Sequence, residues 1–197
     1  MPFSIRSDME AELKKFKDEG IIEEIEGTEW LAPVVAARKQ NGTLRLCVDL
    51  RELNKHVIVD RYPLPNITDM LTMLDCAKIF SNIDLISAYH QIKLSEKSKD
   101  LTAFITPFGT FRYVRLPFGL ISAAAVFQRA LEKVLIDMEG VKIYQDDILV
   151  YGKSYEEHDC RLREVLHRLH MANLTVKFEK CRFKTNSISY LGHTITG

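Results

Sequence analysis

The sequence predicts an α+β fold with a largely antiparallel sheet. Apolar segments rich in β-branched residues, at 30–35, 79–85 and 141–151, are typical of strands. Capping boxes followed by apolar residues at helical spacing are typical of helices. The two kinds of element do not alternate as they would in regular βαβ units, and the chain has no internal repeat. A parallel sheet or a solenoid is therefore not expected.

The first third of the chain is predicted to hold one helix and one hairpin. The capping box Ser7–Glu10 opens the helix, and Gly20 ends it. A strand at 30–35 is followed by the turn Asn41–Gly42 and by a second strand, Leu44–Val48, in which apolar residues alternate. This pattern predicts two antiparallel strands joined by a tight turn.

The middle of the chain is predicted to contain two helices, a buried strand and a second hairpin. Two prolines precede a short helix that is expected at about 67–74. A buried strand is expected at 79–85, and a hairpin at 104–114 turns at Pro107–Gly109. The clearest long helix is predicted for 123–138.

The last third begins with an apolar hairpin at 141–151 that is interrupted by Gln145–Asp147. A second capping box, Ser154–Glu157, opens a helix that extends to about residue 172. Two short strands, at about 175–178 and 188–191, are expected to complete the fold.

The composition restricts the class of protein. At 197 residues the chain is about one domain long, and 46% apolar against 27% charged residues exclude wholesale disorder. No apolar run reaches the roughly 18 residues of a membrane span, and the N-terminus lacks the apolar stretch of a signal peptide. The four cysteines have no CxxC spacing and do not indicate a disulfide framework or a zinc knuckle. We therefore expect a soluble, intracellular protein without a membrane partner.

The charge balance does not by itself indicate a nucleic-acid-binding protein. The 27 basic and 27 acidic residues cancel. Their distribution is uneven, because 1–29 has an acidic excess, whereas 30–63 and 153–184 each have a basic excess. Two basic segments fit a surface for a polyanion, but they fit an ordinary solvated surface equally well.

Adjacent aspartates interrupt the apolar hairpin at 141–151. Asp146 and Asp147 would repel one another there unless a cation compensates their charge. A plain turn, which aspartate also favours, is the alternative. Asp84 ends the buried strand at 79–85, where an ionised group needs a partner. If both strands deliver their aspartates to one sheet edge, the three carboxylates suit two Mg²⁺ ions and nucleotidyl transfer.

A series of short motifs follows the chain in a specific order. They are Trp30-Leu-Ala-Pro-Val-Val, Arg45-Leu-Cys-Val-Asp-Leu-Arg-Glu-Leu-Asn54, Phe80-Ser-Asn-Ile-Asp-Leu-Ile-Ser-Ala-Tyr-His-Gln91, Leu116-Pro-Phe-Gly-Leu120, Phe127-Gln128, Tyr144-Gln-Asp-Asp-Ile148 and Tyr190-Leu-Gly-His193. In this order they resemble a reverse transcriptase, and most closely that of the gypsy-type long-terminal-repeat retrotransposons. A single YxDD motif is a weak signal, but the resemblance covers almost the whole chain.

The resemblance implies a right-hand polymerase fold whose antiparallel palm sheet is backed by helices. Fingers at about 1–78 and 93–115 would interleave with a palm at about 79–92 and 116–197, with the thumb and RNase H absent from this chain. The implied activity is DNA synthesis with dNTPs, from a primer 3′-hydroxyl on an RNA or DNA template. RNase H and integrase regions would be neighbours in a polyprotein. The expected location is a cytoplasmic retroelement particle, or the nucleus.

The resemblance also implies roles for the carboxylates. Asp84 and Asp146 would bind two Mg²⁺ ions, for which Mn²⁺ can substitute. Asp147 would support the charge, and the Leu85 carbonyl would be a further metal ligand. Lys180 would act as general acid to the departing pyrophosphate.

Contacts with nucleotide, template and primer are implied as well. Tyr89 would stack under the sugar and exclude a 2′-hydroxyl, with a core-filling aromatic as the alternative. Lys39 and Arg45 would bind the triphosphate through charge-assisted hydrogen bonds, with two solvated charges as the alternative. The other implied contacts are Ser87 and Ala88 with the nucleotide, Gly119 with nucleotide or template, Gln128 with the template, and Tyr190, Leu191, Gly192 and His193 with the primer.

Some positions depart from the family pattern, such as Ala124 in place of the usual proline, and none removes a metal ligand. Two other functions stay open. A retroelement-derived fragment could fold and at most bind nucleic acid, and a two-metal nuclease or cyclase fits the carboxylates but not the motif order. A zinc site on the predicted helix that begins after Ser154 is not favoured, because His158 and Cys160 lie on different sides of that helix.

Overall fold

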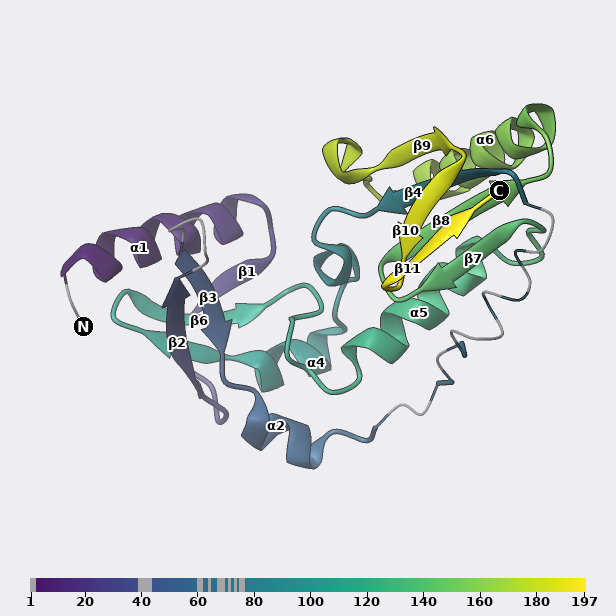
Figure 1. Cartoon of the computed structure of the whole chain (residues 1–197). Coiled ribbons are helices and arrows are strands. Elements are labelled where there is room, and N and C mark those ends of the chain that lie inside the picture. The colour runs from purple at the N-terminus through teal and green to yellow at the C-terminus, as the bar shows by residue number, and fades with distance from the viewer. Residues whose placement is uncertain are drawn as a thin grey trace. The chain divides into compact units, whose positions relative to one another are not determined.

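A computed structural model describes residues 3–38, 44–59, 62–63, 65–66, 70, 72, 74 and 77–197 (Figure 1). The chain divides into two compact units, and it crosses between them three times. Unit 1 comprises residues 1–59 and 89–123, and unit 2 comprises residues 60–88 and 124–197.

Unit 1 is built on a five-stranded sheet with the strand order β1-β6-β5-β2-β3. β2 and β5 pair in parallel, and the remaining pairings in this sheet are antiparallel. Helix α1 (Phe3–Asp18) packs on the sheet and buries Met9 and Leu13 in its core. The strands are β1 (Ile22–Ile25), β2 (Ala32–Arg38), β3 (Leu44–Val48), β5 (Phe104–Thr106) and β6 (Gly109–Tyr113).

Helix α1 begins earlier than the sequence predicts. The capping box at Ser7–Glu10 lies inside the helix, because Ile5 also packs against the core of unit 1 and extends the helix by a turn. The predicted end is confirmed. Gly20 has a φ of +64°, its N–H donates to the Lys17 carbonyl (3.0 Å), and the Ile21 N–H donates to the Phe16 carbonyl (2.9 Å). These are the two bonds of a Schellman motif, which needs a residue with positive φ.

The hairpins predicted around Asn41–Gly42 and at 104–114 are present as the pairs β2–β3 and β5–β6, although the Asn41–Gly42 turn lies outside the described residues. Short helices that the sequence pattern does not predict also occur in unit 1. They are α2 (Arg51–His56), the 3₁₀ turn η1 (Ala88–Gln91), α4 (Glu96–Lys99) and the 3₁₀ turn η2 (Asp100–Thr102), and η1 begins at the last residue before the second segment of the unit. Helices this short show too little periodicity to be found in a sequence. None of the helices that the structure describes is both long and apolar enough to cross a membrane.

Unit 2 is built on a four-stranded antiparallel sheet with the order β7-β8-β4-β9. Helix α6 packs on β8 and β4, and a separate hairpin, β10–β11, covers the opposite face of the sheet (Figure 1). The elements are β4 (Ile79–Asp84), α5 (Ala123–Val134), β7 (Val141–Tyr144), β8 (Asp147–Gly152), α6 (Tyr155–Met171), η3 (Phe178–Lys180), β9 (Arg182–Thr185), β10 (Ser187–Tyr190) and β11 (His193–Thr196).

The alternation of side chains along β4 decides which face carries the aspartates. Phe80 packs with Ile188 and Tyr190 of the β10–β11 hairpin. Ser81 points to the other face, where its hydroxyl lies 2.9 Å from the ring of His158 on α6. Because successive strand residues alternate, Asp84 shares the face of Phe80. The predicted catalytic residue is therefore on the side of the sheet that the hairpin covers.

Two helices in unit 2 test the sequence signals. The capping box at Ser154 is confirmed, since its side chain accepts a hydrogen bond from the Glu157 N–H (3.2 Å). Helix α5 ends at Val134, four residues before its predicted end, and Asp137 nearby has a φ of +58° that a helix cannot contain. The helix predicted at 67–74 lies largely outside the described residues, although Met70 and Thr72 are helical.

The strand predicted at 175–178 is wrong. Val176 forms only an isolated bridge with Leu85, and the chain then turns through η3. The N–H groups of Lys180 and Cys181 bond the Lys177 carbonyl, which closes a local turn and prevents a continuous ladder. The strand at 188–191 is confirmed as β10. The neighbouring strands β9 and β11 were not predicted.

Candidate active site

The central pair of strands in unit 2 brings two of the predicted carboxylates together. β4 and β8 pair antiparallel, and the register places Asp84, the last residue of β4, directly opposite Asp147, the first residue of β8. Asp146 lies in the two-residue loop before β8 and is exposed. Strands distant in sequence thus deliver the aspartates to one edge of the sheet, as the sequence predicts.

The segment after α6 places a cation beside Asp84. The Asp84 carbonyl accepts a hydrogen bond from the Lys177 N–H (2.8 Å), and the Ile86 N–H donates to the Thr175 carbonyl (3.0 Å). These bonds hold the segment against the end of β4. The turn η3 then directs the Lys180 ammonium to 3.4 Å from an Asp84 carboxylate oxygen, with 59% of the lysine side chain exposed. Lys180 therefore offsets the charge of Asp84 while it stays accessible to solvent.

Asp147 lies where ionisation is costly. Burial raises the pKa of its carboxyl, and the negative charges of Asp146 and Asp84 raise it further. A hydrogen bond from the Asn82 amide (3.3 Å) and the charge of Lys180 act in the opposite direction. The net result is a raised pKa, and its main cause is the burial of the carboxyl.

The donors at this edge are hard oxygen atoms. Asp84 and Asp147 contribute carboxylates, and Asn82 Oδ1 is a buried amide oxygen without a hydrogen-bond partner in the described part of the chain. Oxygen donors of this kind suit Mg²⁺. Among the residues that the structure describes, no three His, Cys, Asp or Glu side chains gather closely enough to form a complete metal cluster. The oxygen donors fit the predicted Mg²⁺. The three carboxylates do not converge on one point in this structure.

The residues after Asp84 make a tight bend. The Leu85 side chain is buried, Ser87 has a φ of +43°, and Ala88 is buried where η1 begins. The division between the units falls between Ala88 and Tyr89. The predicted nucleotide contacts Ser87 and Ala88 therefore belong to the same unit as the carboxylates.

Tyr89 belongs to unit 1, where it is half-buried in an aromatic group. Its ring centroid lies 4.9 Å from that of Phe118, which is 42% exposed, and Phe118 also contacts His90 (5.0 Å). Burial lowers the pKa of His90 to about 4, so this ring is neutral at pH 7. Tyr89 is therefore neither a fully buried core residue nor a free surface one.

Gly119 lies in a loop that Asn54 holds in place. Gly119 has a φ of +89°, and in the described part of the chain no atom beyond its two chain neighbours lies within 4 Å of where a Cβ would be. The Asn54 amide donates to the Gly119 carbonyl (2.9 Å) and its oxygen accepts from the Ile121 N–H (2.9 Å). Sequence reasoning gave Asn54 no role. Its position at the end of the Arg45–Asn54 motif was the signal that could have indicated one.

The two predicted triphosphate contacts are described only in part. Arg45 lies in β3, and its backbone pairs with Ala37 of β2. Lys39 and the turn that follows it lie outside the described residues. The contact of either residue with a triphosphate stays a prediction.

The predicted primer contacts form a tight hairpin. Tyr190 pairs with His193, and the two loop residues Leu191 and Gly192 have φ values of +50° and +81°. Positive φ at both positions is the signature of a type I′ turn. Tyr190 is buried among Phe80, Leu149 and Ile188, and burial, with the charge of Asp147, raises its pKa. The loop therefore extends from a hairpin that packs on the sheet face carrying the aspartates.

Gln128 is fully buried on α5. Its amide oxygen accepts a hydrogen bond from the Gln145 N–H (2.6 Å), and its amide nitrogen donates to the Ile143 carbonyl (3.1 Å) and to Glu132 (2.7 Å). The predicted contact with a template stays a prediction. In this structure the side chain bonds the hairpin that carries Asp146 and Asp147.

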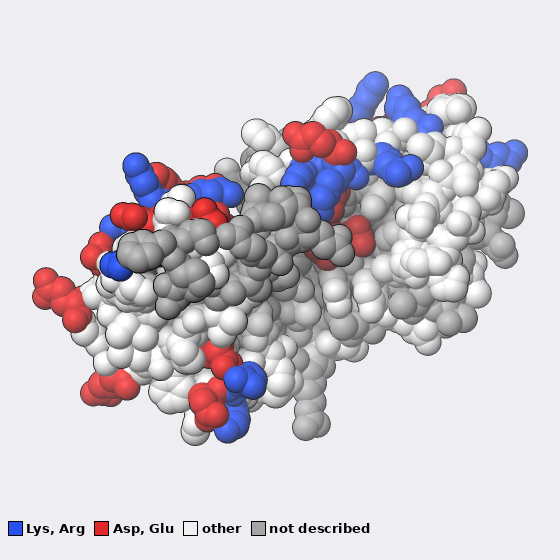
Figure 2. Space-filling view, turned by 60° about the vertical axis from the view of Figure 1, so that its left-hand side comes forward, with Lys and Arg blue, Asp and Glu red and all other residues white. Residues whose placement is uncertain are grey.

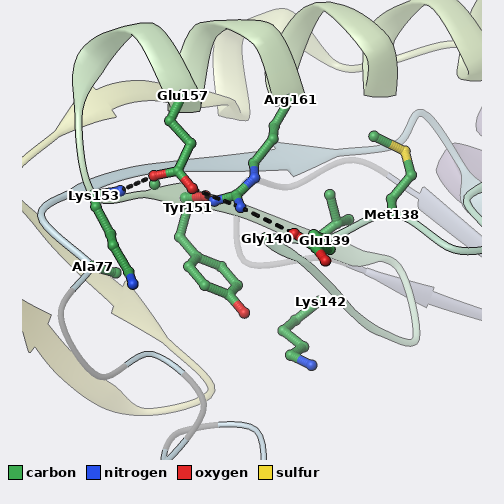
Figure 3. Close-up of a pocket in the computed structure, with 11 residues that line it drawn as sticks. Ala77, Met138, Glu139, Gly140, Lys142, Tyr151, Lys153, Glu157 and Arg161 are labelled. Atoms are coloured by element: carbon green, nitrogen blue, oxygen red, sulfur yellow. Dashed lines mark hydrogen bonds and ion pairs between the residues drawn. The ribbon is translucent and has the colours of Figure 1, made fainter.

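The opposite end of the same hairpin holds a polar pocket. Arg161 of α6 extends over Gly140, where it pairs with Glu157 (2.7 Å) and Glu139 (3.9 Å) and donates to the Tyr151 carbonyl (2.9 Å) (Figure 3). A Cβ at Gly140 would lie 2.5 Å from the arginine side chain. Arg161 therefore links α6 to β8 and to the turn that precedes β7.

Charged side chains of both signs are visible on the face of the molecule in Figure 2. On the face shown in Figure 2, Lys and Arg side chains are interspersed with Asp and Glu and do not merge into one basic surface.

Comparison with known proteins identifies the family. The family described as "Reverse transcriptase (RNA-dependent DNA polymerase)" matches residues 37–195. The Pol polyprotein of transposon opus from Drosophila melanogaster is 35% identical over 99% of this chain and 20% of its own length. The Pol polyprotein of transposon gypsy from the same species is 40% identical over 79% of this chain and 15% of its own length. The chain therefore spans about a fifth or less of these relatives.

Solved structures show the same fold. A foamy viral protease–reverse transcriptase in complex with double-stranded DNA matches with a TM-score of 0.90 at 24% identity, over 99% of this chain and 34% of that chain. The foamy viral enzyme in complex with an RNA/DNA hybrid also gives 0.90, at 23% identity, over 100% of this chain and 26% of that chain. The predicted α+β fold and the predicted resemblance are both confirmed, and the chain belongs to the reverse transcriptase family, with relatives among the gypsy-type retrotransposon Pol polyproteins.

Proposed function

We propose that this chain is the fingers and palm portion of a polymerase that extends a primer 3′-hydroxyl with dNTPs on an RNA or DNA template. We equate unit 1 with the fingers and unit 2 with the palm, which assigns 60–78 to the palm, and 89–92 and 116–123 to the fingers, in contrast to the bounds predicted from the sequence. The observation that carries the proposal is the register of β4 and β8, which sets Asp84 opposite Asp147 with Lys180 beside it. A nuclease or cyclase would need the carboxylates but not the ordered motifs of the family.

Two Mg²⁺ ions are the proposed cofactors, held by Asp84, Asp146, Asp147 and the Leu85 carbonyl, and Mn²⁺ can substitute. When bound, the ions activate the attacking oxygen and neutralise charge on the phosphates. The raised pKa of Asp147 and the hard oxygen donors of the site support this assignment. Positioning and charge compensation are the main contributions that the protein has to supply.

The chain's own residues have separate tasks in this proposal. Lys180 is exposed and lies beside Asp84, and it would act as general acid to the departing pyrophosphate. Ser87, Ala88 and Tyr89 follow Asp84 directly and would contact the nucleotide, together with Gly119, Lys39 and Arg45. The loop between Tyr190 and His193 would hold the primer end.

The proposed partners follow from the family. The foamy viral relatives were solved with double-stranded DNA and with an RNA/DNA hybrid. We extend these partners to this chain, and we place it in a polyprotein beside RNase H and integrase regions. A cytoplasmic retroelement particle is the proposed location, with the nucleus as the alternative.

A primer-extension assay separates the candidate functions. The chain is incubated with a labelled primer on an RNA or a DNA template, with and without Mg²⁺ and dNTPs. Extension that needs both Mg²⁺ and dNTPs supports the polymerase. Salt-dependent binding without extension supports a fragment that only binds nucleic acid. Nicking of the template without dNTPs supports a nuclease and contradicts the proposal.

Tyr89 provides a second test, because an aromatic ring beneath the sugar discriminates by packing. Tyr89→Ala should raise incorporation of rNTPs relative to dNTPs, and Tyr89→Phe should change this ratio little. The expected change corresponds to about 1–3 kcal/mol, the size of a local packing effect. An unchanged ratio in a well-folded Tyr89→Ala protein, verified by a melting curve, would show that Tyr89 only fills space next to Phe118.

A further inference from the structure

The loop that joins β7 to β8 contains a residue in an unfavourable conformation. Tyr144 pairs with Asp147, so the loop consists of Gln145 and Asp146, and Gln145 has a φ of +55°. Left-handed backbone is costly for a residue with a Cβ, which is why such loops favour Gly, Asn or Asp at this position. Gln145 therefore needs support from outside the loop to keep this conformation.

Gln128 supplies that support from α5. Its amide oxygen accepts from the Gln145 N–H (2.6 Å), and its amide nitrogen donates to the Ile143 carbonyl (3.1 Å). One side chain thus bonds both the strand that enters the loop and the strained residue in it. A carboxylate could not replace it, since it would offer no donor to Ile143.

A second layer fixes the orientation of the Gln128 amide. Glu132, one turn later on α5, accepts from the Gln128 amide nitrogen (2.7 Å), and its other oxygen accepts from the Tyr62 hydroxyl. If the amide turned over, its nitrogen would face the Gln145 N–H and its oxygen would face two acceptors. Because the side chain is fully buried, water could not compensate for these losses.

We infer that Gln128 is the positioning residue of the loop Gln145–Asp146, and that it holds the strained backbone so that Asp146 and Asp147 stay at the sheet edge with Asp84. This role rests on the proposed function of the aspartates, and it differs from the predicted contact of Gln128 with a template. Gln128 contacts no reacting atom and acts through the backbone of Gln145.

Amide hydrogen exchange, followed by NMR, tests the inference without reference to activity. In the parent chain the Gln145 amide should be protected, because its acceptor is a buried side chain. Gln128→Met keeps the volume and removes the acceptor, so protection at Gln145 should fall at least about tenfold while the amides of β8 stay protected. Gln128→Asn, which shortens the side chain by one methylene, is the milder variant should the first fail to fold. Persistent protection at Gln145 in a folded variant would overturn the inference.

Leu131→Ala is the matched control, since Leu131 is a buried residue of α5 whose loss removes packing but no hydrogen bond to the loop. It should lower the melting temperature and leave the Gln145 amide protected. In primer extension, Gln128→Met should lower kcat on the order of 100-fold with little change in the KM for dNTP, because a displaced aspartate affects chemistry more than binding. Each variant is assayed at a temperature equally far below its own melting temperature. If Gln128→Met then loses no more kcat than Leu131→Ala, the positioning role is contradicted.

Rescue gives the sharpest outcome. Glycine adopts positive φ without strain, so adding Gln145→Gly to Gln128→Met should restore kcat about tenfold relative to Gln128→Met alone, with Gln145→Gly measured separately as the baseline. If Gln128 only stabilised the fold, Gln145→Gly would not restore kcat in Gln128→Met. Absence of this rescue would overturn the inference. If the parent chain does not polymerise but the exchange result holds, the proposed function fails and the positioning role stands.

Discussion

The hairpins β5–β6 and β7–β8 both turn through two residues, but they are stabilised differently. In β5–β6, Thr106 accepts a hydrogen bond from the Phe108 N–H (3.1 Å) and donates to the Gly109 carbonyl (2.9 Å). Gly109 takes the positive φ of +134° that this hairpin needs. Its turn is therefore supported by its own residues.

In β7–β8 the positive φ falls on Gln145, and the supporting side chain, Gln128, comes from α5. The loop has no glycine and places two aspartates next to one another. Gln145 does not favour the backbone conformation that it has in this loop, and Gln128, which is distant in the sequence, stabilises it. Departures of this kind are expected where a sequence serves a function in addition to folding. The contrast is consistent with the function that we propose for the aspartates of the second hairpin.

The largest effect is expected when a charge is removed from the second hairpin, β7–β8. Asp146→Asn keeps the volume and removes the charge, so primer extension should fall by several orders of magnitude, because a neutral amide lacks the negative charge that would hold the ions. The fold should stay intact, since the change relieves repulsion between carboxylates. Single-turnover extension and a melting curve measure both quantities.

Asp137→Asn is the matched control for that variant. Like Asp146, Asp137 is a turn residue of unit 2. Its φ is +58°, a conformation that asparagine tolerates. It should extend primers like the parent. Extension by Asp146→Asn within tenfold of the parent would show that the metal assignment is wrong.

A smaller effect is expected from breaking the first hairpin. Thr106→Val removes the hydroxyl and leaves the Phe108 N–H without its partner, which should lower the free energy of unfolding by about 1–2 kcal/mol. Thr110→Val, the same substitution on the paired strand β6, should have little effect. Urea denaturation measures the difference. Equal losses in the two variants would mean that the Thr106 hydroxyl does not support the turn.

The smallest effect concerns the dependence of stability on pH. The pKa of Asp147 is raised in the folded chain, so its contribution to stability is fully present below the unfolded value of 3.8 and is lost as the pH rises through its folded pKa. Asp147→Asn should therefore increase the free energy of unfolding at pH 7, by a fraction of a kcal/mol. Urea denaturation at pH 7 and at pH 3.5 should show a gain only at the higher pH.

Asp49 provides the opposite case in unit 1. Hydrogen bonds from Arg51 lower the pKa of Asp49 to about 2, so its contribution is present above 3.8 and is lost as the pH falls toward 2. Asp49→Asn should therefore reduce stability at pH 7. A loss of stability in both variants would contradict the assignment of Asp147 as a buried, uncompensated carboxylate.

The sequence predicted those parts of the molecule that depend on local signals. The strand ending at Asp84 and the capping box at Ser154 were found, because alternation, burial and capping are properties of neighbouring residues. The start of α1 was misplaced, since packing of Ile5 outweighed the local signal at Ser7. The strand at 175–178 was wrong because its hydrogen bonds closed a turn.

For the candidate site, the placement of three residues can be compared with the sequence. The family motifs indicated the aspartates and Lys180, and the structure sets Asp84 opposite Asp147 with Lys180 beside it. Gln128 and Asn54 could not be given their bonding partners from the sequence, because each bonds a loop that lies far along the chain. No local pattern specifies such a contact.

The most direct test of the account is to locate the metal on the protein. Mn²⁺ is titrated into the isotopically labelled chain, and paramagnetic broadening of the backbone amide resonances is followed by NMR. The account predicts that amides near Asp84 and in the Gln145–Asp147 segment broaden first, and that Asp146→Asn weakens this broadening whereas Asp137→Asn does not. Broadening that begins elsewhere, for example along the acidic start of α6 at Glu156 and Glu157, would contradict it.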